Sequence, residues 1–102
     1  MTIETVQKLI EDEVAGNWSQ INDHGCDLRK CMVQPELREY DDSGTGRLVK
    51  MWLVFEEFPE DRSGYKIVYG EKVGMFGLAG PGTQRDVFIG YYGTFLETYH
   101  AM

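Results

Sequence analysis

One segment of this chain, residues 47–57, restricts the possible folds more than any other, because it is apolar on both of its alternating sides. Successive residues of a β-strand point to opposite faces of a sheet. One side carries Val49, Met51, Leu53 and Phe55, and the other carries Leu48, Trp52 and Val54. A strand that is apolar on both faces has to be covered on both, so we predict that it is the central strand of a sheet.

A helix is predicted at each end of the chain. In residues 3–15 an apolar stripe recurs at helical spacing, formed by Ile3, Val6, Ile10 and Val14. Thr2 stands where an N-cap belongs, and Gly16 stands where a helix ends. From Thr94 onward, a second apolar side is formed by Phe95, Leu96, Tyr99 and Met102. Trp18 and Ile21 are expected to pin the connection after the first helix to the core.

Shorter segments predict the other strands, at 31–40, 65–69, 75–79 and, more briefly, 87–89. Pro35 lacks an N–H group, which indicates a sheet edge or a bulge within the first of them. Strands that follow one another between terminal helices predict an α+β fold. We therefore expect an antiparallel sheet of about four strands in meander order, with the N-terminal and C-terminal helices packed on one face. The 102 residues form a single domain, 1–102.

This arrangement leaves one face of the sheet to be explained. Two short helices cover one face of a four-stranded sheet, but hardly both. The second face is expected to carry Leu48, Trp52 and Val54, with Glu56 at its rim. A contiguous exposed apolar patch marks an interaction site. We therefore interpret these four residues as a candidate interface with a protein partner or with a second copy of the chain, in a homodimer.

The charge of the chain argues against one class of partner. Seventeen acidic residues oppose ten basic ones, which gives a formal net charge of −7, and no three Lys or Arg residues run together. Such a chain repels phosphate backbones, so no nucleic-acid partner is expected. The same charge would attract a basic protein.

Three features indicate the compartment. The first residues, Met1-Thr2-Ile3-Glu4, lack the basic and apolar pattern of a secretory signal. No apolar run approaches the roughly 18 residues that a membrane span needs, so no membrane partner is expected. Two cysteines fit a reducing environment. We expect a cytoplasmic protein of bacterial origin.

The glycine-rich segment 74–82 resembles a nucleotide-binding loop only superficially. It lacks the Lys-Ser/Thr pair of a phosphate-binding loop, and no helix pattern follows it. Pro81 also removes one backbone donor. We interpret the segment as a closely packed strand followed by a loop, and we predict no cofactor.

Four residues could in principle ligate a metal or supply a nucleophile, namely His24, Cys26, Cys31 and His100. Their spacing matches no usual zinc pattern, because the paired Cys-x-x-Cys unit is absent, and we predict no metal site. Cysteine catalysis requires a thiolate that a base activates. Cys26 with His24, or Glu56 as an acid–base group, keeps a small enzyme open as an alternative.

The C-terminal part of the chain carries a resemblance. Residues 64–79, Gly-Tyr-Lys-Ile-Val-Tyr-Gly-Glu-Lys-Val-Gly-Met-Phe-Gly-Leu-Ala, are followed at 90–102 by a glycine, aromatic residues and a short helix pattern. From Gly64 to Met102 the chain resembles small uncharacterised bacterial proteins of unknown function. The resemblance implies a strand–turn–strand unit before a terminal helix, and it implies no activity.

The sequence therefore favours a non-enzymatic cytoplasmic protein-interaction module. One alternative is an acidic immunity- or antitoxin-like protein that binds a basic partner through charge complementarity. Another is a small enzyme or ligand-binding protein with a site near Cys26 and Glu56. A ligand could also bind in a cleft between the loop 80–86 and the C-terminal helix.

Overall fold

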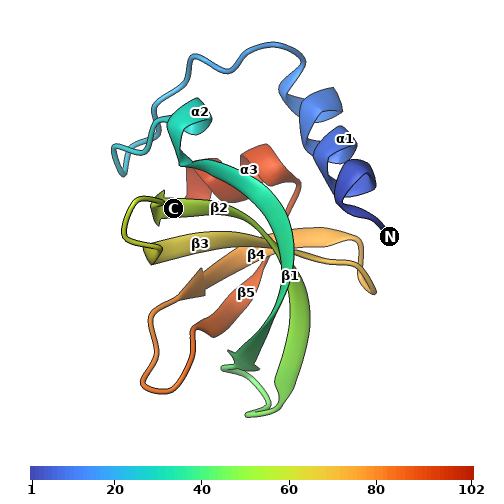
Figure 1. Ribbon diagram of the computed structural model, residues 1–102, viewed down its shortest axis with the longest axis vertical. Coiled ribbons are helices and arrows are strands. Elements are labelled where there is room, and N and C mark those ends of the chain that lie inside the picture. The colour runs from blue at the N-terminus through green and yellow to red at the C-terminus, as the bar shows by residue number, and fades with distance from the viewer.

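In the computed structural model, which describes residues 1–102, five strands curl into a barrel beneath three helices (Figure 1). The elements are α1 (Ile3–Val14), α2 (Leu28–Cys31), β1 (Met32–Asp42), β2 (Leu48–Phe58), β3 (Ser63–Gly70), β4 (Met75–Gly80), β5 (Val87–Gly93) and α3 (Phe95–Ala101). Each strand pairs antiparallel with the next. The predicted α+β class and meander order are confirmed, with five strands in place of about four.

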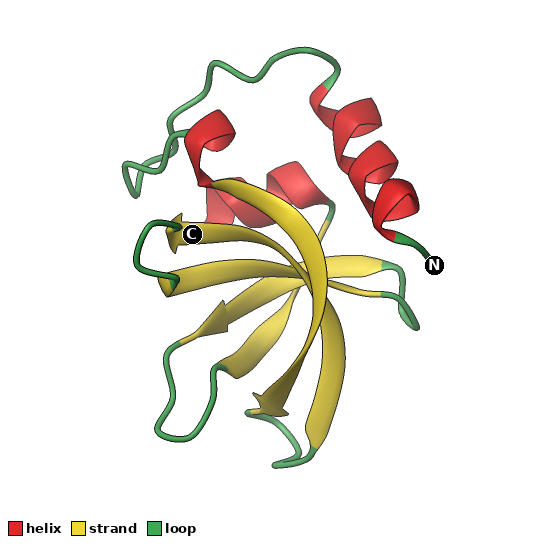
Figure 2. Ribbon diagram, viewed as in Figure 1, coloured by secondary structure: helices red, strands yellow, loops and turns green.

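A short parallel contact closes the barrel. β1 and β5 pair at two positions only, Asp41 with Val87 and Asp42 with Phe88. Through this contact the sheet covers its own second face. The three helices gather at one side of the barrel, as the colouring by secondary structure shows (Figure 2). No helix is long and apolar enough to cross a membrane.

The apolar residues divide into two clusters, one on each face of the sheet. The inner cluster fills the barrel and consists of Tyr40, Met51, Leu53, Val68, Ala79 and Phe88. The outer cluster joins the helices to the sheet and includes Val6, Ile10, Trp52, Val54, Phe55, Phe95 and Tyr99. The predicted uncovered face was therefore wrong. Trp52 and Val54 face the helices, and the opposite face lies inside the barrel.

Bulges give the sheet the curvature that closure requires. The pairing of β2 with β3 shifts between Leu53 and Phe55, and the pairing of β1 with β2 shifts between Met32 and Glu36. The second shift surrounds Pro35, so the predicted bulge is confirmed. Where β4 meets β5, a Cβ atom on Gly77 would lie 2.3 Å from the carbonyl oxygen of Gly90. These two strands approach so closely because position 77 has no side chain.

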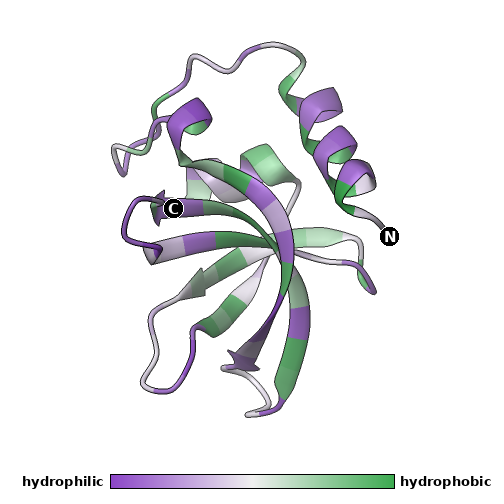
Figure 3. Cartoon of the chain, in the orientation of Figure 1, coloured by the Kyte–Doolittle hydropathy of each residue, from purple (hydrophilic) through white to green (hydrophobic).

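The two longer helices are linked through one carboxylate. α1 begins at the N-cap Thr2, as predicted, and buries the apolar stripe that includes Val6 and Ile10. Its outward turns are hydrophilic in Figure 3. Near its C-terminal end, Glu13 accepts hydrogen bonds from the backbone N–H groups of Phe95 (3.0 Å) and Leu96 (2.7 Å) at the start of α3. Both helices therefore cover the same face of the sheet, as expected.

The loop between α1 and α2 is held by buried polar groups. The side-chain amide of Asn22 donates to the carbonyl oxygen of Tyr99 at 2.8 Å. The hydroxyl of Tyr99 donates to the carbonyl oxygen of Cys26 at 2.5 Å. Trp18 packs against the outer cluster, as predicted, but Ile21 is 70% exposed, so its predicted role in the core was wrong. Asn22 takes the buried position in its place.

Candidate functional site

The four residues of the predicted interface do not share one surface. Val54 and Glu56 are fully buried, Trp52 is 9% exposed, and Leu48 is 51% exposed. Val54 lies beneath the helices, whereas Glu56 pairs across the sheet with Lys66, whose next neighbour Ala79 lies in the inner cluster. Val54 and Glu56 therefore cannot contact a partner, and the four residues form no common patch.

Leu48 and Trp52 both line one hollow on the surface. It has a volume of about 500 Å³ and lies between β1, β2 and the turn from β3 to β4. Leu37 and Tyr91 line the same hollow. The indole N–H of Trp52 donates to the carboxylate of Glu71 at 3.2 Å, so the turn holds this ring against the barrel.

The two cysteines lie buried beside each other, away from solvent. Burial raises the pKa of the Cys26 thiol to about 11, and the neighbouring Cys31 and the Glu57 carboxylate add to the shift. A thiol with this pKa stays protonated at neutral pH and is a poor nucleophile. Cys31 lies at the end of α2, and burial raises its pKa as well.

Both histidines contact other side chains. The ring nitrogen Nε2 of His24 lies 2.6 Å from Oε2 of Glu57, and the ring packs edge-on against Tyr65. His100 is exposed, and its ring packs edge-on against Tyr99. No three His, Cys, Asp or Glu side chains come together as a metal-binding group.

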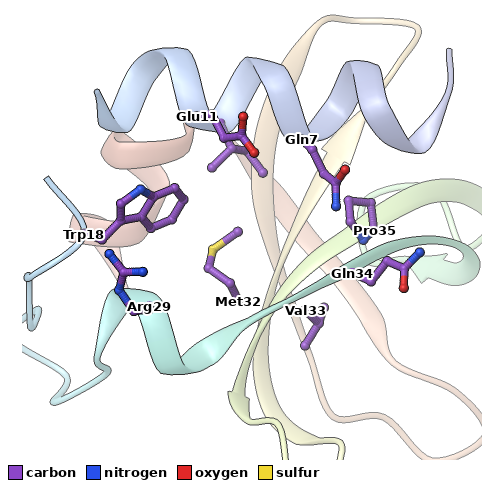
Figure 4. Close-up of a pocket in the computed structure, with 9 residues that line it drawn as sticks. Gln7, Glu11, Trp18, Arg29, Met32, Val33, Gln34 and Pro35 are labelled. Atoms are coloured by element: carbon purple, nitrogen blue, oxygen red, sulfur yellow. The ribbon is translucent and has the colours of Figure 1, made fainter. Parts of the chain in front are cut away.

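A groove that the sequence did not indicate runs between α1 and β1 (Figure 4). Its volume is about 410 Å³. Trp18 and Arg29 close one end, Met32 points from the start of β1 toward α1, and Gln7 faces Pro35 at the other end. The groove is also lined by Ile10, Glu11, Val33 and Gln34. The loop and α2 thus bring residues 18 and 29 to one end of a cleft formed by distant elements.

Trp18 is held in place by a contact on its ring. The guanidinium carbon of Arg29 lies 5.8 Å from the centre of the Trp18 ring, within the range of a cation–π interaction. Arg29 is exposed and Trp18 is half-buried. A preordered aromatic ring presents apolar area at a low entropic cost on binding.

Along the same strand, part of the backbone has no partner. β1 pairs with β2 on one edge, but on the other edge it pairs with β5 only at its last two residues. The N–H of Asp41 points toward β5, since it donates to the carbonyl oxygen of Asp86 at 3.1 Å. By the alternation of a strand, the N–H and C=O groups of Leu37 and Glu39 also point toward this open edge.

The groove escaped prediction because its residues show no common pattern in the sequence. Trp18 was expected only to pin a loop, and Arg29 and Met32 had no predicted role. Only the path of the loop and of α2 brings them together. Comparison of the chain with protein-family models, with curated proteins and with solved structures found no match in any of the three.

Proposed function

We propose that this protein is a non-enzymatic protein-interaction module that holds its partner in the groove between α1 and β1. The observation that carries the proposal is the grouping of Trp18, Arg29 and Met32 around one cleft. Trp, Arg and Met are enriched at the centres of protein interfaces, and Trp and Arg in particular are frequent hot spots.

The surroundings of the groove favour a protein partner. Its floor is apolar, from Ile10 and Met32, and its rim carries the amides of Gln7 and Gln34. An apolar centre with a hydrogen-bonding rim is the usual arrangement of an interface. The open edge of β1 continues from this cleft and offers backbone groups to an extended segment.

The state of the candidate nucleophile supports a non-enzymatic role. Cys26 is buried, and its pKa of about 11 keeps it as a thiol. The ring of His24 contacts the carboxylate of Glu57, and no hydrogen bond joins it to Cys26.

Site-specific photo-crosslinking tests the proposal. A photoreactive amino acid replaces the exposed Gln34 at the groove, and a control carries it at the exposed Thr45, in the turn between β1 and β2. We expect one defined adduct in extracts of the source cell from position 34 and none from position 45. Trp18→Ala in the same protein should abolish the adduct while leaving the thermal melting transition in place. Adducts that form equally from both positions, or that survive Trp18→Ala, would refute the groove as the binding site.

A second candidate function is that of an immunity- or antitoxin-like protein, which binds a basic protein partner. The supporting observation is the excess of acid, with a net charge of −7. Phe58, the last residue of β2, is 53% exposed beside Glu60 and Asp61 of the turn that follows. Binding of this kind should weaken steeply with salt, because charge attraction between exposed groups is screened. An adduct whose yield is unchanged between low and high salt speaks against this second function.

A further inference from the structure

One end of the barrel interior is charged. Directly paired residues in an antiparallel sheet share a face, and three charged residues pair with or lie beside members of the inner cluster. Arg38 pairs with Met51, Glu36 pairs with Leu53, and Lys66 pairs with Ala79. The apolar core therefore gives way to charges at this end of the barrel.

Two of the charges lie at full depth. The side chain of Lys66 is 2% exposed, and its ammonium lies 3.1 Å from Oδ2 of Asp86 and 3.8 Å from Oε2 of Glu56. Oε1 of Glu56 lies 2.6 Å from Nε of Arg62, so this carboxylate contacts two cations. The buried charges are thus paired with one another inside the chain.

Tyr40 supplies a buried polar group that has no partner in the chain. The residue is 1% exposed, and its hydroxyl has no hydrogen-bond partner in the chain. Burial raises the pKa of this phenol, and the charges of Arg38 and Asp86 act on it. The hydroxyl therefore remains a neutral donor and acceptor at physiological pH. Buried polar groups in folded proteins are nearly always paired, so this hydroxyl has a hydrogen bond to offer to a water molecule or to a ligand.

The cavity lies between β1 and the loop before β5, where the two strands have not yet met. It measures about 450 Å³, and Tyr40 is part of its wall. Three arginines line it, Arg38, Arg62 and Arg85, together with three acids, Glu36, Glu39 and Asp86. The loop 80–86 thus borders a hollow, as one sequence-based alternative expected, but the opposite wall is β1 and not the C-terminal helix.

We propose that this cavity, here named the barrel mouth, binds a small zwitterion that carries a carboxylate and an ammonium group, as a free amino acid does. Arginine binds carboxylates through paired hydrogen bonds, and the facing acids suit an ammonium group. Within the chain these groups already pair, Glu36 with Arg38 and Arg62, and Arg85 with Asp41. The three arginines and three acids of the lining balance in charge, which favours a ligand without net charge. A volume of 450 Å³ is within the range of small-molecule sites. This site is separate from the groove of the proposed function.

The test is an NMR titration of the ¹⁵N-labelled protein with each of the twenty free amino acids. Acetate and methylammonium, which carry only one of the two charges, serve as comparison ligands. We expect at least one amino acid to shift the amide signals of residues 38–40 and 84–86, and we expect acetate and methylammonium to bind at least about tenfold more weakly. Tyr40→Phe should weaken the binding about three- to tenfold, as loss of one hydrogen bond does.

Matched variants separate binding from folding. Tyr91→Phe removes a hydroxyl from the far side of the inner cluster, at the hollow of Leu48, and should leave the affinity unchanged. Arg85→Gln alters the exposed rim, where the side chain is 40% exposed, and should weaken binding without changing the melting temperature. The proposal is overturned if no amino acid shifts these signals, if acetate binds as well as the best amino acid, or if Tyr40→Phe binds with unchanged affinity.

Discussion

Glu56 and Lys66 form a buried ion pair at the inner end of β2 and β3, with both side chains almost entirely removed from solvent. Removing one partner of such a pair leaves an uncompensated buried charge, whereas replacing both with apolar residues is often neutral. The stability of the fold therefore depends on the two charges being present or absent together.

We expect Lys66→Met to lower the free energy of unfolding by about 3–5 kcal/mol. The double variant Glu56→Leu with Lys66→Met should recover most of that loss, because the charges that lose a partner, Arg62 and Asp86, are partly exposed to water. Urea denaturation of the two variants and the unchanged protein measures both values. A loss below about 1 kcal/mol for Lys66→Met would show that Arg62, and not Lys66, compensates Glu56.

Two buried acids make the stability sensitive to alkaline pH. Burial raises the pKa of Cys26 to about 11 and that of Tyr99 to about 12. In the unfolded chain these groups ionise near their ordinary values, about 8.5 and 10. Above those values the unfolded state loses protons that the folded state retains. The contribution of these two groups to stability is therefore constant below about pH 8.5 and falls as pH rises toward 12.

Urea midpoints measured between pH 8 and pH 11 test this expectation. The midpoint should fall with pH in the unchanged protein, and it should fall less steeply in Cys26→Ala. A Lys72→Gln variant, altered at an exposed position in the turn between β3 and β4, serves as the control and should keep the original slope. An equal slope in Cys26→Ala would mean that Cys26 ionises alike in both states.

At the scale of elements, the joint between α1 and α3 rests on one carboxylate. Glu13 accepts two backbone N–H groups that α3 cannot satisfy internally. Within α3, Thr94 and Glu97 form a capping box that satisfies two further donors. Glu13→Ala should therefore cost about 2 kcal/mol, the value of hydrogen bonds to a charged group. Thermal or urea unfolding measures the loss.

Glu11→Ala, at an exposed position two residues earlier in the same helix, is the matched control for Glu13→Ala. It removes a carboxylate that caps no helix, so its effect should stay within about 0.5 kcal/mol. Equal losses in the two variants would assign the effect to α1 alone and not to its joint with α3.

The elements themselves were largely predictable, because the periods of the apolar residues reveal helices and strands directly. The face of the sheet on which a residue lies was less predictable, and Glu56 shows why. Strict alternation along the strand would place Glu56 on the same face as Trp52 and Val54. The register shift between Leu53 and Phe55 moves every later residue of β2 to the other side, so Phe55 meets the helices and Glu56 enters the barrel. No residue in this apolar segment signals such a bulge.

The contacts within the candidate sites were hard to predict for the same reason, because they depend on strand register and barrel closure. Lys66 and Glu56 could be recognised as charges within strands, but their contact depends on the register between those strands. Tyr40 and Asp86 meet only because the barrel closes. Closure depends on accumulated twist and curvature over five strands, which no local pattern records.

At the scale of the whole molecule, the seam between β1 and β5 is the narrowest connection of the barrel. It consists of two paired positions, with N–H groups of Asp41 and Ser43 donating to Asp86 and Phe88 at 3.1 Å each. β3, in contrast, pairs along its length with β2 and β4 and contains the fully buried Ile67. Regions with few buried contacts open locally at a free energy well below that of global unfolding.

Native-state hydrogen exchange should therefore show the seam opening first. We expect the amides of Asp41 and Ser43 to exchange through a local opening that is insensitive to low denaturant, while the amides of β3 exchange only with global unfolding. The barrel mouth lies directly beside this seam, since Tyr40 and Asp86 flank the paired positions. A zwitterion that bridges Arg38 and Asp86 would tie β1 to the loop before β5, so its binding should slow exchange at Asp41 more than at Ile67. Equal protection of the seam and of β3 in the free protein would mean that the barrel opens only as a whole.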